Sequence, residues 1–391
     1  MFSTRGQDQS VQSDQGDRSV FMVNHPVRAV KNNWGARLGG IAPVLACVPE
    51  GALPVRAAFE AVRAGLAGDV ESLRGQSRYI FSFEDRTGDV VAMLRRWHRG
   101  EYAPSLSAVS VLGIENLGLV LPPEIENGLL VASILGEVEH GGAYHNNLHF
   151  RKVLLQAMRM AFVHNRIYAG TDLAFDGRTA GLLMMAACIH DLGHDGKGNY
   201  VGGVLVPGRL EKKSFELARP YLEQCGVKPD DLEMVRVMLR CTDVVPLRSA
   251  SSPINQMKAA YRYHYAGGDN LQFDPDFSIL RDDKDLVMLA AVLHEADIAT
   301  SAGLSYEMTI FESGLFEKEN GGGVPSPSDI LDFLGEDVCQ GQMTTEAGKA
   351  LYSDNMARII KDVRKDFDGG NRSYPPLENS VFLKHSPEHT P

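Results

Sequence analysis

A histidine–aspartate pair lies in the most informative segment of this chain, Cys188-Ile-His-Asp-Leu-Gly-His-Asp-Gly-Lys-Gly-Asn199. The segment follows an apolar stretch with helical spacing, so His190 and Asp191 place an imidazole and a carboxylate side by side where a predicted helix ends. Such a pair can bind a divalent metal ion, and its carboxylate can bridge to a second ion. Because a single His-Asp dipeptide is common, this pair carries weight only together with further ligands.

Two other segments can supply those ligands. His149 ends Tyr144-His-Asn-Asn-Leu-His149, and Asp297 lies in Leu293-His-Glu-Ala-Asp-Ile298. A lone histidine on an apolar helix is more often a core residue, but a carboxylate buried at Asp297 without a partner would cost several kcal/mol. Contributions from three predicted helices are what a metal site inside a helical bundle requires. Two imidazoles and two carboxylates suit zinc, with iron or manganese as alternatives at a second position.

Two ions at such a centre would permit hydrolytic chemistry. Ions about 3.5–4 Å apart can share a bridging water and lower its pKa enough to give hydroxide near neutral pH. The same ions would bind the oxygens of a phosphate ester and offset the charge that develops during attack. The sequence therefore predicts a binuclear metal centre formed by His149, His190, Asp191 and Asp297.

The composition limits the function classes. The chain has 391 residues and a formal net charge of −11, so nucleic-acid binding is not expected. The five cysteines are scattered without CxxC spacing, which indicates reduced thiols in a cytoplasmic protein. No apolar run reaches the roughly 18–20 residues that span a bilayer, and the first residues resemble no signal peptide, so no membrane association is expected.

The elements that must position these residues are helices. Apolar residues recur three to four positions apart through most of the chain, and convincing alternating strands are absent. The predicted helices cover residues 54–73, 89–97, 123–138, 149–163, 179–190, 210–224, 229–241, 285–302 and 344–367. Residues 79–83 are predicted to be a short extended piece. The fold class expected from this pattern is all-α, a multi-helix bundle.

Four regions are expected along the chain. Residues 1–32 are rich in Gln, Ser, Asp and Gly, which predicts a disordered N-terminal tail. Residues 33–118 form an N-terminal helical part of the catalytic domain, and residues 119–368 form its metal-binding core. Residues 369–391 are again predicted to be a tail.

These motifs together resemble the class I 3′,5′-cyclic nucleotide phosphodiesterases, a branch of the HD-type metal phosphohydrolases. The family's central motif is His-Asp-x-x-His-x-Gly-x-x-Asn, matched by His190, Asp191, His194, Gly196 and Asn199. Its upstream Tyr-His-Asn-x-x-His motif is matched from Tyr144 to His149. Its Thr-Asp pair is matched by Thr242-Asp243, and its His-x-Ala-Asp segment by residues 294–297. The order and rough spacing agree over most of the catalytic domain, with departures that suggest a distant, microbial member.

The resemblance implies a role for each matched residue. The tighter ion, zinc, would be bound by His149, His190, Asp191 and Asp297. Asp191 would bridge to a second ion, magnesium or manganese, whose waters would be held by His194, Glu211 and Asp243. The general acid would be His145, since an imidazolium is a good proton donor near neutral pH. His145 precedes His149 by four residues, so on a helix the two side chains would face the same side.

Recognition of the nucleotide base is less well matched. The family uses a glutamine followed three residues later by an aromatic residue, and Gln340 and Met343 are the best match. A methionine packs on a base as a softer clamp. Gln342 is a rival, and a plain surface glutamine is an equal alternative. Tyr144 is also assigned to substrate binding.

Departures from the family pattern concern the base more than the hydrolysis. The Ala-x-Asp that usually follows the second histidine is Phe150-Arg-Lys152, and an asparagine that contacts the base is Thr300. The main expectation is hydrolysis of cyclic AMP, cyclic GMP or both to 5′-monophosphates by a hydroxide shared between two metals. An HD-type phosphohydrolase of another nucleotide or cyclic dinucleotide is the alternative, and a non-catalytic nucleotide-binding protein is a third. A homodimer and a protein partner for the N-terminal tail are left open.

Overall fold

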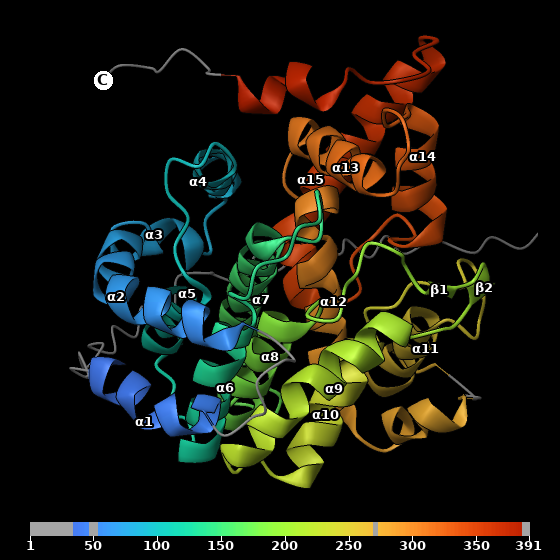
Figure 1. The fold of residues 1–391 in the computed structure, drawn as a ribbon. Coiled ribbons are helices and arrows are strands. Elements are labelled where there is room, and N and C mark those ends of the chain that lie inside the picture. The colour runs from blue at the N-terminus through green and yellow to red at the C-terminus, as the bar shows by residue number, and fades with distance from the viewer. Residues whose placement is uncertain (1–33, 47–53, 269–272, 385–391) are drawn as a thin grey trace, which may run out of the picture.

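The computed structural model of the chain describes residues 34–46, 54–268 and 273–384, which form an all-α fold (Figure 1). The first eight helices are α1 (Trp34–Ala46), α2 (Val55–Arg74), α3 (Ser77–Ile80), α4 (Thr87–His98), α5 (Leu106–Leu117), α6 (Pro123–Leu135), α7 (Asn147–Ile167) and α8 (Gly177–Ile189). The later ones are α9 (Arg209–Gln224), α10 (Pro229–Arg240), α11 (Pro253–Tyr265), α12 (Lys284–Ala302), α13 (Tyr306–Glu319), α14 (Pro327–Asp332) and α15 (Glu346–Asp368). Three 3-10 helices are η1 (Pro275–Arg281), η3 (Leu377–Asn379) and η4 (Val381–Leu383), and η2 (Phe333–Asp337) is a π-helix.

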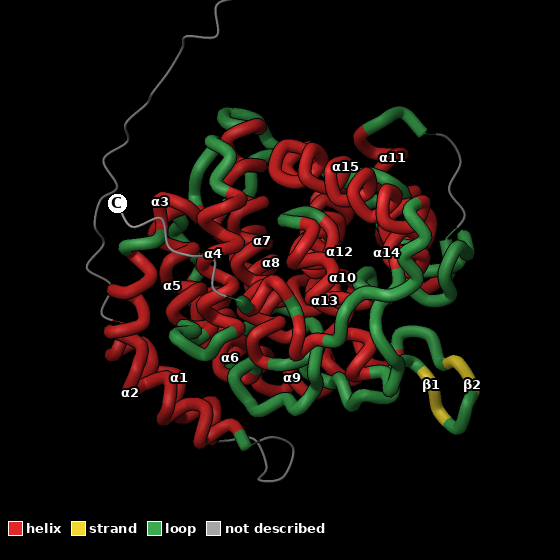
Figure 2. Tube along the Cα trace, turned by 90° about the horizontal axis from the view of Figure 1, so that it is seen from above, coloured by secondary structure: helices red, strands yellow, loops and turns green. Residues whose placement is uncertain are grey.

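Three helices form the centre of the fold. Helices α7, α8 and α12 pack against one another, and the other helices surround them (Figure 2). Every residue from Ala180 to Ile189 in α8 is buried, and nearly every residue from Leu286 to Ala302 in α12 is buried as well. A helix that is apolar on all sides must be enclosed by other elements, which explains why α8 and α12 occupy the core.

The start of each central helix is fixed by a polar cap. The side chain of Asn146 accepts hydrogen bonds from the backbone N–H groups of Leu148 and His149 at the start of α7. Asp176 and Asp283 cap α8 and α12 in the same way. Such caps satisfy N–H groups that have no partner within the helix. The cap at Asn146 also fixes where α7 begins relative to the residues before it.

Two expectations on secondary structure were wrong. Residues 77–80 form the single-turn helix α3 rather than the extended piece expected over 79–83. His145 does not share a helix with His149, because α7 begins at Asn147. The other predicted helices are found, with ends that differ by a few residues. The predicted N-terminal tail, residues 1–32, lies outside the described residues.

A small β-hairpin projects from the helical body (Figure 2). Strand β1 (Tyr200–Val201) pairs antiparallel with β2 (Val204–Leu205). The two residues between them, Gly202 and Gly203, have φ of 57° and 83°, the backbone conformation that a tight two-residue hairpin turn requires. The hairpin follows the His-Asp segment directly in sequence.

Residues 377–384, which lie within the predicted C-terminal tail, pack against the helices. Phe382 is fully buried, with its ring centroid 4.8 Å from that of Phe311 and 5.8 Å from that of His98. Arg99 donates hydrogen bonds of 3.2 Å to the carbonyl oxygens of Leu383 and Lys384. Residues 377–384 therefore connect α13 to α4.

No single helix in the described ranges is long and apolar enough to cross a membrane; α12 and α13 meet the test of length and composition only as a pair, bent by 103°. The four cysteines that the structure describes are unpaired, as the sequence predicted.

Candidate metal centre and active site

Four side chains from three helices converge where the sequence placed a metal centre. His149 Nε2 lies 3.2 Å from His190 Nε2, 3.1 Å from Asp297 Oδ1 and 3.3 Å from Asp191 Oδ2. His190 Nε2 lies 3.1 Å from Asp191 Oδ2 and 3.7 Å from Asp297 Oδ1. His149 lies in the first turn of α7, His190 and Asp191 follow α8, and Asp297 lies within α12. Ligand atoms of His149, His190 and Asp297 lie within 4.8 Å of one another, close enough to share one ion.

The donor set suits a divalent metal. The Nδ1–H of His190 donates a 3.0 Å hydrogen bond to the carbonyl oxygen of Ala187, which leaves the Nε2 lone pair facing the centre. A backbone acceptor on the far ring nitrogen is the usual way in which a protein orients a metal-binding histidine. Both histidines are buried, and imidazole nitrogens with carboxylate oxygens are the ligands that zinc prefers.

The electrostatics of these groups also favour a cation. Burial would raise the pKa of Asp191, but the positive charges of His190 and His145 outweigh it and hold that pKa well below its usual range. The pKa of Asp297 is likewise lowered, against its burial, by the hydrogen bond with His149 and the charge of His190. Burial would lower the pKa of His190, but the Asp191 carboxylate outweighs it and raises the pKa to about 9, so without a cation Nε2 holds a proton that a bound metal ion would replace. Two partly buried carboxylates thus stay ionised and favour positive charge beside them.

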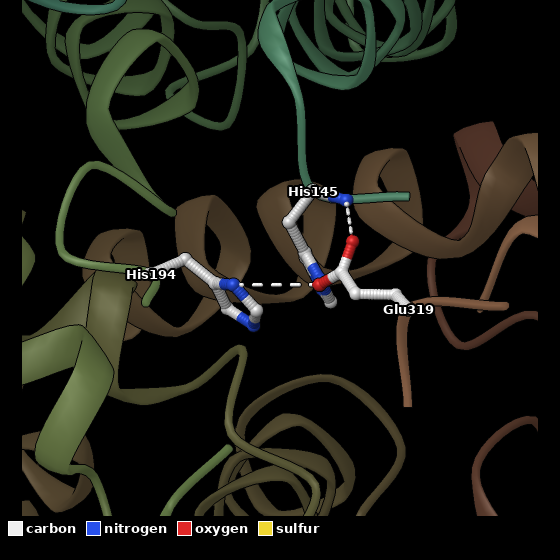
Figure 3. A group of neighbouring side chains, drawn as sticks. All are labelled: His145, His194 and Glu319. Atoms are coloured by element: carbon white, nitrogen blue, oxygen red, sulfur yellow. Dashed lines mark hydrogen bonds and ion pairs between the residues drawn. The ribbon is translucent and has the colours of Figure 1, made fainter. Parts of the chain in front are cut away.

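His145 lies beside this centre and is held by a carboxylate (Figure 3). The His145 Nδ1–H donates to Glu319 Oε1 at 2.6 Å, and the backbone N–H groups of Tyr144 and His145 donate to Glu319 Oε2 at 2.7 and 2.9 Å. With Nδ1 engaged, Nε2 is the nitrogen that faces the centre, 3.9 Å from Asp191 Oδ2. The residue predicted as general acid is therefore oriented toward the predicted metal ligands.

The ring of His194 stacks on that of His145, with centroids 3.7 Å apart, and its Nδ1 lies 3.5 Å from Glu319 Oε1 (Figure 3). Burial and the charge of His145 lower the pKa of His194 to about 4. Burial would lower the pKa of His145 too, but Asp191 and Glu319 outweigh it and raise that pKa. The pKa values of the two stacked rings are therefore shifted in opposite directions, upward for His145 and downward for His194.

Glu319 was not identified from the sequence. It lies at the C-terminal end of α13, in an alternation of charged and apolar residues typical of a solvated helix face. No local motif marks it, because its role depends on the contact with residues 174 positions earlier. The hydrogen bond with His145 lowers the pKa of Glu319 to about 2, against the effect of its burial.

The residues predicted to hold metal-bound waters, Glu211 and Asp243, lie on the wall of the same cavity. Asn199 connects them to the His-Asp segment: its Nδ2 donates to Glu211 Oε2 at 3.2 Å and its Oδ1 accepts from Leu210 N at 2.9 Å. Asp243 accepts from the backbone N–H of Gly208 at 2.7 Å. Burial, with the charge of Asp243, raises the pKa of Glu211 to about 8, so a cation nearby would favour its ionised form.

The loop after α8 requires glycine for this arrangement. A Cβ on Gly193 would lie 2.6 Å from Ser214 N and 2.8 Å from Leu210 O, so a side chain there would push α9 away. Gly196 has φ of 73°, which glycine adopts without strain. These two glycines allow the loop to run close against the helix that carries Glu211.

A cavity of about 490 Å³ opens beside the metal centre. Eight carboxylates lie on its wall, and none of the described residues that line it is a lysine or an arginine: the acids are Asp191, Glu211, Asp243, Asp297, Glu312, Glu317, Asp329 and Asp337. Away from the metal centre the wall also carries apolar side chains, among them Leu247, Phe316, Ile330 and Phe333. The cavity has the size of a small-molecule site.

One of these acids, Glu312, has a buried partner. Lys152 Nζ lies 2.6 Å from both carboxylate oxygens of Glu312, and His98 Nε2 lies 3.2 Å from Oε1. Lys152 also lies 5.7 Å from the centroid of the Tyr144 ring. The sequence marked Lys152 only as a departure from the family pattern; the structure gives it a counter-ion 160 residues away.

The residues predicted to bind substrate lie in different places. Tyr144 is part of the cavity wall, and its hydroxyl is 3.3 Å from Ser301 Oγ. Gln340 and Met343 are not among the described residues that line the cavity. Gln340 is exposed, with its Nε2 donating to Asn255 Oδ1 at 3.1 Å, and Met343 is buried. Gln342, the rival, is exposed as well.

The sequence matches no model of a known protein family and no curated protein.

Proposed function

We propose that this chain hydrolyses 3′,5′-cyclic nucleotides to 5′-monophosphates. One observation carries the proposal: four ligands for a metal converge within 3.1–3.7 Å beside a histidine that a carboxylate orients toward them. The resemblance in sequence motifs concerns the same residues.

The charge of the cavity supports a metal-dependent reaction of a phosphate ester. A wall with eight carboxyl groups, and no lysine or arginine among its described residues, would repel a phosphate. Two divalent ions, when bound, would supply the positive charge for the phosphate and an activated water. We propose zinc at the site of His149, His190, Asp191 and Asp297, with magnesium or manganese at a second site toward Glu211 and Asp243.

His145 is the proton donor in this proposal. Its Nδ1–H is fixed by Glu319, and although burial would lower its pKa, the Asp191 and Glu319 carboxylates raise it and so favour the protonated form. The departing 3′ oxygen of a cyclic nucleotide is a poor leaving group unless it is protonated, and an imidazolium in hydrogen-bond reach can supply that proton. Tyr144 would contact the substrate next to it.

The test is an assay of the purified chain on cyclic AMP and cyclic GMP with manganese or magnesium, combined with metal analysis of the same sample. We expect 5′-monophosphate from one or both. Metal bound at the centre without turnover of either nucleotide would refute the proposal. Turnover of other nucleotides or cyclic dinucleotides alone would assign the centre to the wider HD group.

Two variants separate the roles of the residues. Asp191→Ala should lose both metal and rate, whereas Asp172→Ala, an exposed aspartate paired with Lys284, should lose neither. His145→Asn should keep metal and lose rate. Its control is His264→Asn, which removes a histidine of α11 that is hydrogen-bonded to the carbonyl oxygen of Leu280, and which should remain active. An active His145→Asn enzyme would mean that another group is the acid.

A further inference from the structure

We propose that Arg248 is a positioning residue that holds one wall of the cavity in place for the substrate. Residues 244–251, named here the strap, connect α10 to α11, and three of them line the cavity: Val244, Val245 and Leu247. The identity of the substrate in this inference rests on the proposed function, whereas the attachment of the strap does not.

Arg248 joins the strap to a second part of the wall. Its Nη1 lies 3.0 Å from Glu336 Oε2, its Nη2 lies 3.6 Å from Asp332 Oδ1, and its Nε–H donates to Asp337 Oδ1. Asp337 itself lines the cavity, and Phe333 on the same segment does so too. One guanidinium thus connects two wall segments that are almost 90 residues apart in sequence.

The backbone on both sides of this connection is unusual. Arg248 and Gln340 have φ of 58° and 54°, and they are the two non-glycine residues with positive φ in the described part of the chain. Side chains rarely adopt this conformation unless surrounding contacts impose it. Gln340 Nε2 donates to Asn255 Oδ1, and Asn255 Nδ2 donates to the carbonyl of Ser249 at 2.8 Å. Gln340 therefore helps to anchor the end of the strap.

The start of the strap is anchored at the metal end of the cavity. Asp243 Oδ1 accepts a 2.9 Å hydrogen bond from Val245 N, while its Oδ2 is engaged by Gly208 N. The strap is thus fixed at its start by Asp243 and at its end by Asn255. Between these points the side-chain anchor is Arg248, directly after Leu247.

The contacts of Arg248 hold the neighbouring side chain, Leu247, in position on the cavity wall. It is 47% exposed although it is apolar, and it lines the cavity. Phe316 and Tyr200, at 46% and 51%, are exposed on the same wall. The free energy falls when a flat apolar surface covers apolar side chains that are exposed to water around a cavity. A nucleotide base offers such a surface. Losing the anchor would let Leu247 move away and leave Asp337 unpaired beside an anionic substrate.

The test compares Arg248→Ala with wild type on whichever cyclic nucleotide is hydrolysed. We expect KM to rise about fivefold, which corresponds to about 1 kcal/mol, with kcat within twofold. Because exposed ion pairs are screened by salt, raising the salt from 50 to 500 mM should increase KM of the wild type more than that of Arg248→Ala. Hydrogen–deuterium exchange of residues 244–252 should be faster in the variant.

Two control variants complete the test. Arg248→Lys keeps the charge, so its KM should be much closer to the wild-type value than to that of Arg248→Ala. Arg219→Ala removes an exposed arginine paired with Glu223 on α9 and should change neither KM nor exchange. An unchanged KM in Arg248→Ala overturns the inference, whatever the exchange shows. If the wild type hydrolyses no cyclic nucleotide, the proposed function fails by itself. Calorimetric binding of 5′-AMP and 5′-GMP then replaces KM, and equal dissociation constants for wild type and Arg248→Ala overturn the inference.

Discussion

Removing the positive charge of Lys152 should destabilise the fold, because Lys152 is the buried counter-ion of a carboxylate on the cavity wall. The Lys152 side chain is 1% exposed and that of Glu312 is 0% exposed, with both oxygens 2.6 Å from Nζ. Lys152→Met keeps the length of the side chain and removes the charge. Leaving one partner of a buried ion pair alone costs about 3–5 kcal/mol.

The pKa of Glu312 gives an independent estimate. Burial would raise it, but the charge of Lys152 and the hydrogen bonds from His98 and Lys152 lower it from 4.5 to about 2. A difference of that size between the folded and unfolded states corresponds to about 3 kcal/mol of stability. Because the folded pKa is the lower one, this stability is present above pH 4.5 and is lost as the pH falls toward 2. The two estimates agree in size.

The measurement is the free energy of unfolding from urea titrations followed by circular dichroism at pH 7. Lys152→Met should lose about 3–5 kcal/mol, whereas Lys152→Met with Glu312→Leu should lose far less, since replacing both partners by apolar groups is often neutral. The double variant should also lose less stability between pH 4.5 and 2 than wild type does. A single variant within 1 kcal/mol of wild type would refute the reasoning.

Three further outcomes are expected. Chelation of the metal should lower the melting temperature by about 3 °C relative to protein with metal at 100 times its dissociation constant. Zinc should reverse this loss in wild type but not in His190→Ala. Equal melting temperatures of the wild type with and without metal would contradict the metal centre. In Glu319→Gln, His145 loses a charge that raises its pKa, so the fall in rate at high pH should move to lower pH. An unmoved limb in the pH–rate profile would exclude that support. Phe382→Ala removes a fully buried ring and should cost about 3–5 kcal/mol in urea unfolding, whereas a true C-terminal tail would tolerate the change.

The convergence of the four predicted metal ligands could be expected because each belongs to a local pattern. His190 and Asp191 follow an apolar helix, and Asp297 lies with His294 and Glu295 in a helix that is otherwise largely apolar. Helical periodicity was read from the same apolar residues, so the central helices were found with their ends displaced by a few positions. The expectation that a helix includes His145 was wrong. The side chain of Asn146 caps α7, which therefore begins at Asn147.

The rest could not be predicted because it depends on contacts between distant segments. Glu319 and Glu312 look like the solvated face of α13, yet the first orients His145 and the second pairs with Lys152. The C-terminal segment has the composition of a tail, and only the space between α4 and α13 makes a buried position for Phe382. Neither α13 nor the C-terminal segment contains a local sequence pattern that identifies its partner.

The difference between residues fixed in the core helices and residues held by contacts between distant segments also bears on substrate selectivity. The predicted metal ligands are tied to the ends and interior of the three central helices, so moving one of them would disturb the core. The wall away from them includes the strap and the segment with Phe333 and Asp337, which ion pairs of Arg248 connect. Substitutions there change surface contacts worth little to the fold. If the chain hydrolyses cyclic nucleotides as proposed, we therefore expect selectivity for the base to respond to changes around Leu247 and Arg248 while the predicted metal ligands stay in place.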